Sequence, residues 1–184
     1  VFELVPDVPG LVYVGRLVRE KGVATLIRAA ARAGVGVRVI GAGPESQALQ
    51  SLARTLAANV EFTGHLVGPA LRDAIAGARA VVLPSEWYEN APLALLEAYA
   101  LGKPVIGAHI GGIPELIREG ETGTAFASGS VDELAARLVE FASRPDDQLA
   151  ALGAEARRVA ETEYSPRRYR ERILDVYRDA GLAA

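Results

Sequence analysis

Short apolar runs alternate with segments of helical periodicity along most of the chain. Runs rich in Val, Ile and Leu, each closed by a Gly, Pro or Ser turn, lie at 11–14, 37–40, 60–62, 80–83 and 104–106, with a weaker sixth run at 124–126. Continuous apolar strands of this length are typical of a parallel sheet that is buried on both faces. The pattern therefore predicts a parallel sheet of about six strands.

The segments between these runs are predicted helices. Their apolar residues recur at three- and four-residue spacings over 23–33, 45–58, 69–78, 91–101 and 113–119. Only helical periodicity remains beyond the sixth run, over 131–143, 146–162 and 166–180, and Ser165 is the expected N-cap of the last helix. The predicted fold is a single Rossmann-like α/β domain over 1–184, a three-layer α/β/α sandwich with extra C-terminal helices.

Composition excludes several classes of protein. The chain has 184 residues, half of them hydrophobic, a net charge of −3 and no cysteine, which excludes disulfides, thiolate zinc sites and cysteine nucleophiles. It lacks the basic stripe that nucleic-acid binding requires, so no nucleic-acid partner is expected. Without a membrane-spanning run or a signal peptide, a cytoplasmic protein is expected. The absence of methionine, even at the start, suggests a fragment of a longer protein.

Two cations follow the first strand, where ligands of open parallel α/β sheets bind. Arg16 comes directly after Gly15, and Lys21 lies just before the next helix. Cations beside helix N–H groups suit a phosphate or a diphosphate. The alternative is a solvated charged turn, although lysine occurs in this sequence only at 21 and 103.

The loop after the fourth strand and the helix that it enters hold three acidic residues and the only tryptophan. If the helix begins near Pro92, Glu89 precedes it and Glu97 lies about two turns inside. Eight helical residues cover about 12 Å, comparable with the distance between the ribose and the hexose of a nucleotide sugar. Glu97 is either a surface residue or, because Leu95, Leu96, Ala98 and Tyr99 surround it in sequence, an acid that needs a partner or a ligand.

Glycine turns follow two further strands, as Gly41-Ala42-Gly43-Pro44 after the second and Gly111-Gly112 after the fifth. A double glycine suits either a close approach of backbone to ligand or a mobile turn, and the sequence favours neither.

Taken together, these residues resemble the C-terminal domain of glycosyltransferase family 4, whose retaining enzymes have the GT-B architecture of two facing Rossmann-like domains. The resemblance covers almost the whole chain, and its elements come in the order that the family has. They are Gly15-Arg16-Leu17…Lys21-Gly22, Gly41-Ala42-Gly43-Pro44, Val60-Glu61-Phe62-Thr63-Gly64, Pro84-Ser85, the Glu89…Glu97 pair, Gly102-Lys103-Pro104-Val105-Ile106 and Gly111-Gly112…Glu115.

The resemblance implies roles for charged residues by their position. Residues matching Arg16 and Lys21, which follow the turn at Gly15, hold the donor diphosphate and stabilise the leaving group without a metal ion or other cofactor. The residue matching Glu89 contacts the transferred sugar, and the one matching Glu97 binds the ribose hydroxyls. Arg16, Lys21 and Glu89 are therefore the expected catalytic residues.

The resemblance also implies main-chain and apolar contacts. N–H groups around Asn90, Ala91 and Leu93 would face the distal phosphate, and Leu66 would line the base. The sequence departs from the commonest family pattern here, because Asn90-Ala91-Pro92 replaces the Phe-Gly that usually follows the first glutamate. Since Pro92 has no N–H, a neighbouring residue must supply one phosphate donor.

The implied reaction is transfer of a hexose from a UDP- or GDP-linked donor to an acceptor hydroxyl, with retention at the anomeric carbon. The isolated chain is expected to be poorly active, because the acceptor site belongs to a missing N-terminal domain on which 166–184 is expected to pack. Similar enzymes often use lipid-linked acceptors, which would bring the full enzyme to the inner face of a membrane.

Three alternatives stay open at this stage. A nucleotide-sugar epimerase would share the donor pocket and would be distinguished by its products. A non-catalytic module would hold the nucleotide sugar only, although intact Arg16, Lys21, Glu89 and Glu97 argue against degeneracy. A flavodoxin-like regulatory domain would need an acidic cluster at the end of the first strand, which is absent.

Overall fold

A sheet of six parallel strands lies at the centre of the computed structural model, which describes residues 10–181. The strands are β1 (Leu11–Val14), β2 (Val37–Ile40), β3 (Val60–Gly64), β4 (Val81–Leu83), β5 (Val105–His109) and β6 (Gly123–Ala127). They are arranged in the order β3-β2-β1-β4-β5-β6, and every neighbouring pair is parallel. The predicted sheet, including its sixth strand, is confirmed.

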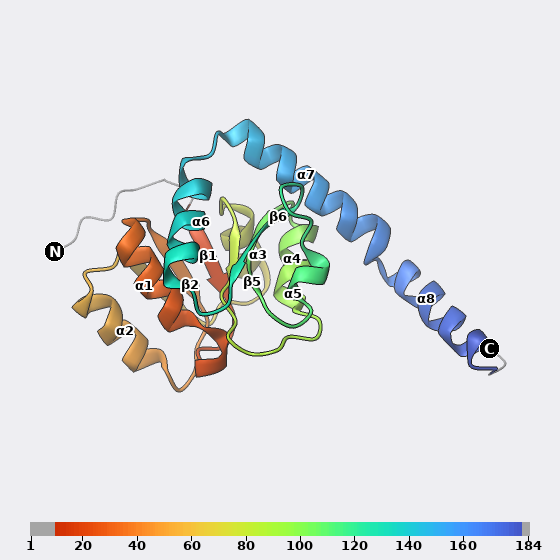
Figure 1. Cartoon of the computed structure of the whole chain (residues 1–184), viewed down its shortest axis with the longest axis horizontal. Coiled ribbons are helices and arrows are strands. Elements are labelled where there is room, and N and C mark those ends of the chain that lie inside the picture. The colour runs from red at the N-terminus through yellow and green to blue at the C-terminus, as the bar shows by residue number, and fades with distance from the viewer. Residues whose placement is uncertain (1–9, 182–184) are drawn as a thin grey trace.

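Helices cover both faces of this sheet because successive strand residues point to opposite sides. Leu11 and Tyr13 pack into the core formed with α1 (Val23–Ala33), α2 (Ser46–Thr55) and α6 (Val131–Ser143). Val12 between them packs into a second core, formed with α3 (Gly68–Ala76), α4 (Leu93–Ala100), α5 (Ile113–Leu116) and α7 (Asp146–Glu163). The result is the predicted α/β/α sandwich, with α1 and α6 side by side on one face (Figure 1).

The C-terminal helix α8 (Pro166–Asp179) continues from α7 and projects away from the body of the domain (Figure 1). Its predicted N-cap is confirmed, since Ser165 Oγ accepts a hydrogen bond from Arg168 N at 3.3 Å. None of its residues is buried. Tyr169, Val176 and Tyr177 are exposed by 68%, 59% and 46% of their surface, which leaves a row of apolar side chains without cover from the described residues.

An arginine joins the start of β4 to the junction between α6 and α7. Arg79 Nε donates to Phe141 O at 3.1 Å, and Nη1 donates to Asp146 Oδ1 at 2.7 Å. Its Nη2 donates to Arg144 O. The side chain of Arg79 is only 12% exposed, so these contacts fix the last two helices of the sandwich to the sheet.

Several predicted helices are shorter in the structure, among them the helix predicted at 45–58, which forms over Ser46–Thr55. The segment predicted at 113–119 forms a helix only over Ile113–Leu116, because Ile117 is already extended. The helix predicted at 91–101 begins at Leu93, since Pro92 precedes it with an extended ψ of 103°. The two ends of the predicted domain, 1–9 and 182–184, lie outside the described residues. No helix among residues 10–181 combines the length and the apolar character needed to cross a bilayer.

Candidate functional site

The strand order places a crevice between β1 and β4. Chain connections run outward from this point in both directions, to β2 and β3 on one side and to β5 and β6 on the other. In open parallel sheets, ligands bind beyond the carboxyl ends of the strands at such a reversal, because the loops separate there. The two loops with the predicted charged residues, β1–α1 and β4–α4, are the ones that meet at this crevice.

A salt bridge joins the two loops across the crevice. Lys21 ends a short 3-10 turn, Arg19–Lys21, and its Nζ contacts Glu89 Oε1. Ser85 Oγ donates to the same carboxylate oxygen at 2.9 Å. Both charged side chains are mostly covered, with 25% of Lys21 and 20% of Glu89 exposed. The structure thus brings together two of the three predicted catalytic residues. Lys21 and Ser85 both contact Oε1 of the Glu89 carboxylate.

The first residues of the β4–α4 loop are held by two neighbouring segments, residues 20–22 and the β6–α6 loop. Glu86 N donates to Glu20 O at 2.9 Å, and Ser128 Oγ donates to Ser85 O at 2.9 Å. Gly22 lies so close to this loop that a Cβ on it would be 1.8 Å from Pro84 O. The segment carrying Lys21 and the loop carrying Glu89 are therefore packed backbone to backbone, and their relative positions are fixed before any ligand binds.

Arg16 lies at the rim of the crevice with an exposed side chain that makes no ion pair among residues 10–181. Its backbone is held by a buried residue of β1, because Tyr13 Oη donates to Arg16 O at 2.8 Å. Gly15 makes room for this bond, since a Cβ there would lie 2.6 Å from the Tyr13 hydroxyl oxygen. Burial raises the pKa of Tyr13 well above its ordinary value, and the negative charge of Glu89 adds to this effect. Tyr13 therefore stays protonated and keeps donating.

The start of α4 offers main-chain donors to the crevice. Asn90, Ala91 and Leu93 are exposed, and their backbone N–H groups have no partner among the described residues. Pro92 is buried. The N-terminus of a helix attracts anions through such N–H groups and through its dipole. Leu66 lies farther along the same edge, half-buried in the β3–α3 loop and packed against the second core.

The sequence argument for Glu97 is wrong in part. Glu97 is exposed and makes no hydrogen bond or ion pair within the described residues, because the apolar neighbours Leu95, Ala98 and Tyr99 point to the buried side of α4. It is the fifth residue of the helix, about one turn from its start, and Glu89 lies in non-helical backbone. The helical spacing of about 12 Å between the two carboxylates therefore does not apply.

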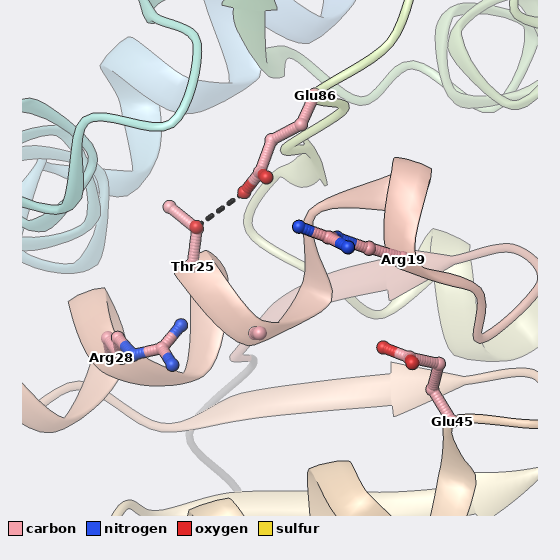
Figure 2. A pocket seen from close by; sticks show the side chains of 6 residues that line it. Arg19, Thr25, Arg28, Glu45 and Glu86 are labelled. Atoms are coloured by element: carbon pink, nitrogen blue, oxygen red, sulfur yellow. Dashed lines mark hydrogen bonds between the residues drawn. The ribbon is translucent and has the colours of Figure 1, made fainter.

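A hollow beside the crevice is bordered by other charged residues. It has a volume of about 450 Å³ and is lined by Arg19, Ala24, Thr25, Arg28, Glu45 and Glu86. Figure 2 shows the side chains converging on it from α1 and from the loops, with Thr25 Oγ1 donating to Glu86 Oε1 at 2.5 Å. None of the predicted donor-binding residues lines this hollow. Its contribution to the site is the bond from Thr25 to Glu86, which adds another tie between α1 and the β4–α4 loop.

Residues 10–181 contain no group of three or more His, Asp or Glu side chains placed to hold a metal ion. The positive charge around the crevice comes from Arg16 and Lys21 and, at the hollow beside it, from Arg19 and Arg28.

Comparison with known protein families agrees with this geometry. A family model described as "Glycosyl transferases group 1" matches residues 3–159. The chain belongs to this family. The expected relationship to GT-B enzymes is thereby confirmed, and the chain has the Rossmann-like fold of one half of that architecture.

Curated relatives of this group 1 glycosyltransferase domain are enzymes named for sugar transfer. A GDP-mannose-dependent monoacylated alpha-(1-6)-phosphatidylinositol monomannoside mannosyltransferase of Corynebacterium glutamicum is 32% identical over 172 residues, covering 88% of this chain and 45% of the relative. A D-inositol 3-phosphate glycosyltransferase of Mycobacterium avium is 34% identical over 159 residues, covering 82% of this chain and 37% of the relative. The chain thus spans less than half of either relative.

Solved structures share the fold of the group 1 domain. Sucrose-phosphate synthase from Thermosynechococcus elongatus superimposes with a TM-score of 0.84 at 26% identity, over 96% of this chain and 46% of that one. The Anabaena protein HepE in complex with UDP superimposes with a TM-score of 0.81 at 23% identity, over 92% of this chain and 48% of that one. At this level of identity the second comparison supports the fold alone.

Some residues that shape the site had no assigned role from sequence. In the sequence, Ser85 stands out only as part of Pro84-Ser85, although its place two residues after a strand and four residues before Glu89 is a usable signal. Ser128 gave no signal, because it reaches the crevice from the distant β6–α6 loop. Gly111 and Gly112 were noticed, but the structure places their turn against protein backbone rather than in a free loop.

Proposed function

We propose that this chain is the donor-binding half of a retaining hexosyltransferase that uses a UDP- or GDP-linked sugar. The observation that carries the proposal is the Lys21–Glu89 pair at the reversal of strand order, with the free N–H groups of α4 beside it. A cation and a helix N-terminus suit a diphosphate, and a carboxylate suits sugar hydroxyls. The relative named for GDP-mannose supports a donor of this class.

The donor is proposed to lie along the edge of the sheet from β3 to β5. Its diphosphate would contact Arg16 and Lys21, which follow the turn at Gly15, and the N–H groups of Asn90, Ala91 and Leu93. Its ribose would reach the exposed carboxylate of Glu97 on α4. Its base would lie against the half-buried Leu66, and the hexose would lie beside Glu89.

The proposed chemistry needs a group that stabilises the departing diphosphate. As the bond between the anomeric carbon and the phosphate oxygen breaks, the bonding electrons move to that oxygen and negative charge grows there. Arg16 and Lys21 are placed to stabilise this charge more in the transition state than in the bound substrate, in a role that needs no metal ion. The acceptor hydroxyl attacks the same face of the sugar and passes its proton to the departing phosphate oxygen, which retains the anomeric configuration.

Lys21 would change partners during binding. Without a donor its charge is balanced by Glu89. A diphosphate carries more negative charge than one carboxylate and would draw Lys21 away, which frees Glu89 Oε1 for a sugar hydroxyl while Ser85 still donates to it. In the unliganded protein each group of the ion pair therefore occupies a contact that the donor would take over: Lys21 that of the diphosphate, and Glu89 that of the sugar hydroxyl.

The remaining part of the enzyme is proposed to contain the acceptor-binding domain. The chain spans less than half of the curated relatives, and the exposed side chains of Tyr169, Val176 and Tyr177 leave one side of α8 uncovered. We propose that this side packs on that domain, and that the chain alone transfers sugar poorly. The relative named for a phosphatidylinositol monomannoside supports an enzyme that works at a membrane face, and we propose that this is the cytoplasmic face.

Calorimetric titration of the chain with UDP, GDP and ADP and with their hexose conjugates tests the donor proposal. We expect saturable binding of one nucleotide family, weakened in Arg16→Ala and Lys21→Ala by about tenfold or more, since each loses a charge-assisted contact. Arg72→Ala is the matched control, because Arg72 is 65% exposed on α3 and pairs only with its neighbour Asp73. Equal affinities in Arg16→Ala and the control would contradict the proposal.

A separate experiment tests the docking of α8. In the full-length enzyme, Val176→Ser combined with Tyr177→Ser should lower the midpoint of thermal unfolding, whereas the same change in the present chain should not. Equal effects in both proteins would show that α8 packs on nothing outside the described domain.

A further inference from the structure

The turn after β5 lies directly against the backbone that carries Glu89. A Cβ on Gly111 would be 2.6 Å from Glu89 N and 2.7 Å from Glu89 O. A Cβ on Gly112 would be 2.4 Å from Asn90 O. Gly112 N also donates to Glu89 O at 2.6 Å. The contact is backbone against backbone, so no flexible side chain can move aside to relieve it.

Glu89 is consequently held from two directions. Lys21 and Ser85 bind its carboxylate on one side of the crevice, and the glycine turn holds its main chain on the other. The carboxylate is joined to the main chain by rotatable bonds, so its donors alone do not determine where Oε2 points. The position of the backbone at residue 89 supplies the missing constraint.

We propose that Gly111 and Gly112 are positioning residues that set the Glu89 carboxylate for the transferred sugar. The proposal rests on the proposed function and adds a specific element to it. Any residue larger than glycine at either position must push the turn and the Tyr88–Asn90 backbone apart, because real Cβ atoms do not come within 3.0 Å of such atoms. For Gly111→Ala the required shift is at least about 0.4 Å.

A shift of this size matters for the sugar more than for the nucleotide. Binding and catalytic groups have to be held to within about 0.5 Å, and a misplacement of about 1 Å can reduce the rate a hundredfold. The proposed diphosphate contact at Arg16 and the ribose contact at Glu97 lie on segments that the turn does not touch, whereas Asn90, whose N–H is proposed to face the diphosphate, lies on the displaced backbone. The defect should therefore be larger in recognition of the sugar than in binding of the nucleoside diphosphate.

Gly111→Ala has a matched control in Gly120→Ala. Both glycines have a left-handed backbone, with φ of +57° and +75°, so alanine causes similar backbone strain at each. They differ in their surroundings, because nothing lies within 4 Å of the Cβ position at Gly120. Any difference between the two variants then reports the contact with the Glu89 loop rather than strain in the turn.

The first measurement needs no ligand. Two-dimensional amide NMR spectra should show shifts at Tyr88, Glu89 and Asn90 in Gly111→Ala and none there in Gly120→Ala. The second is calorimetric titration with a nucleoside diphosphate and its hexose conjugate. We expect Gly111→Ala to bind the diphosphate within about twofold of the wild type and the conjugate about tenfold more weakly, with Gly120→Ala unchanged for both.

Different failures have different meanings. Unchanged amides at 88–90 in Gly111→Ala, or conjugate binding equal to that of Gly120→Ala, would overturn the positioning role while leaving the donor site in place. A wild-type chain that binds no nucleotide sugar would overturn the proposed function and this inference with it. If Gly111→Ala does not fold, Gly112→Ala replaces it. Its φ of −81° suits alanine, and its control is Gly77→Ala, with a φ of −77° and a nearest contact of 3.3 Å.

Discussion

Removing the negative charge of Glu89 should tighten the binding of a nucleoside diphosphate. In the unliganded protein Lys21 is paired with Glu89, so a diphosphate has to compete with that carboxylate for the same cation. Glu89→Gln keeps the size of the side chain and removes the competitor. The same variant loses a charged acceptor for sugar hydroxyls, so the hexose conjugate should gain nothing or bind more weakly.

The magnitude follows from the burial of the pair. Exposed ion pairs contribute about 0–1 kcal/mol, and this pair, with 25% and 20% of its side chains exposed, belongs at the upper end of that range. A gain of about 1 kcal/mol corresponds to about fivefold in the dissociation constant. The unliganded variant should in turn lose about 1 kcal/mol of unfolding free energy, because Lys21 no longer has its partner.

Isothermal calorimetry with the diphosphate and its hexose conjugate, on wild type and variant, measures both effects. Glu86→Gln is the control, since it removes the same charge from the same loop and Glu86 bonds to Thr25 rather than to Lys21. The gain for Glu89→Gln should shrink as salt is added, because added ions screen the pair. Weaker diphosphate binding in Glu89→Gln, or a gain no larger than that of Glu86→Gln, would refute the reasoning.

Three further predictions concern the scaffold. Arg79→Ala should lower the free energy of unfolding, measured in urea, by about 2–3 kcal/mol, because three acceptors lose a mostly buried charged donor. The control Arg72→Ala should lower it by less than about 0.5 kcal/mol. Similar values for the two variants would contradict this. Burial raises the pKa of Tyr99 to about 12. Above about pH 10 the folded state therefore keeps a proton that the unfolded state loses. The free energy of unfolding should consequently fall by up to about 1.4 kcal/mol per pH unit between pH 10 and 12. Denaturant titrations at several pH values should show a shallower fall in Tyr99→Phe, and an identical slope would argue against this source. Ending the chain after Ser165 should change the midpoint of thermal unfolding by less than about 3 °C, since no residue of α8 is buried. A larger drop would show that α8 supports the domain.

Local pattern predicted the elements of the fold, because both periodicities are properties of neighbouring residues. The apolar runs gave the six strands, and Ser165 gave a helix start that the structure confirms. The order of the strands in the sheet could not be predicted from this pattern, because the apolar runs are too similar to reveal which strands pair. Boundaries failed where a residue type has two uses. Pro92 suits a first helical turn, yet here it is the extended residue before the helix.

The site shows the same division between local and distant information. Arg16, Lys21 and Glu89 could be selected as candidates because they lie in the loops that follow the first and fourth strands, and the family resemblance supplied their expected roles. The apolar sequence neighbours of Glu97 wrongly suggested that its carboxylate is buried. Residues adjacent in sequence point about 100° apart around a helix, so their side chains do not share one environment. The contact of Gly111 with Glu89 joins two loops separated by β5 and α4, and only the folded chain reveals it.

The order of the strands also determines how the chain divides. β1 to β3 form one contiguous half of the sheet and β4 to β6 the other, so a cut in the turn between α3 and β4 would give two fragments that each keep three adjacent strands. The β1–β4 edge and the packing of α1 on α6 would be the main contacts between them. Lys21 would belong to the first fragment and Glu89 to the second. A bound nucleotide sugar would then act as a crosslink, and reassembly of the fragments would depend on the donor.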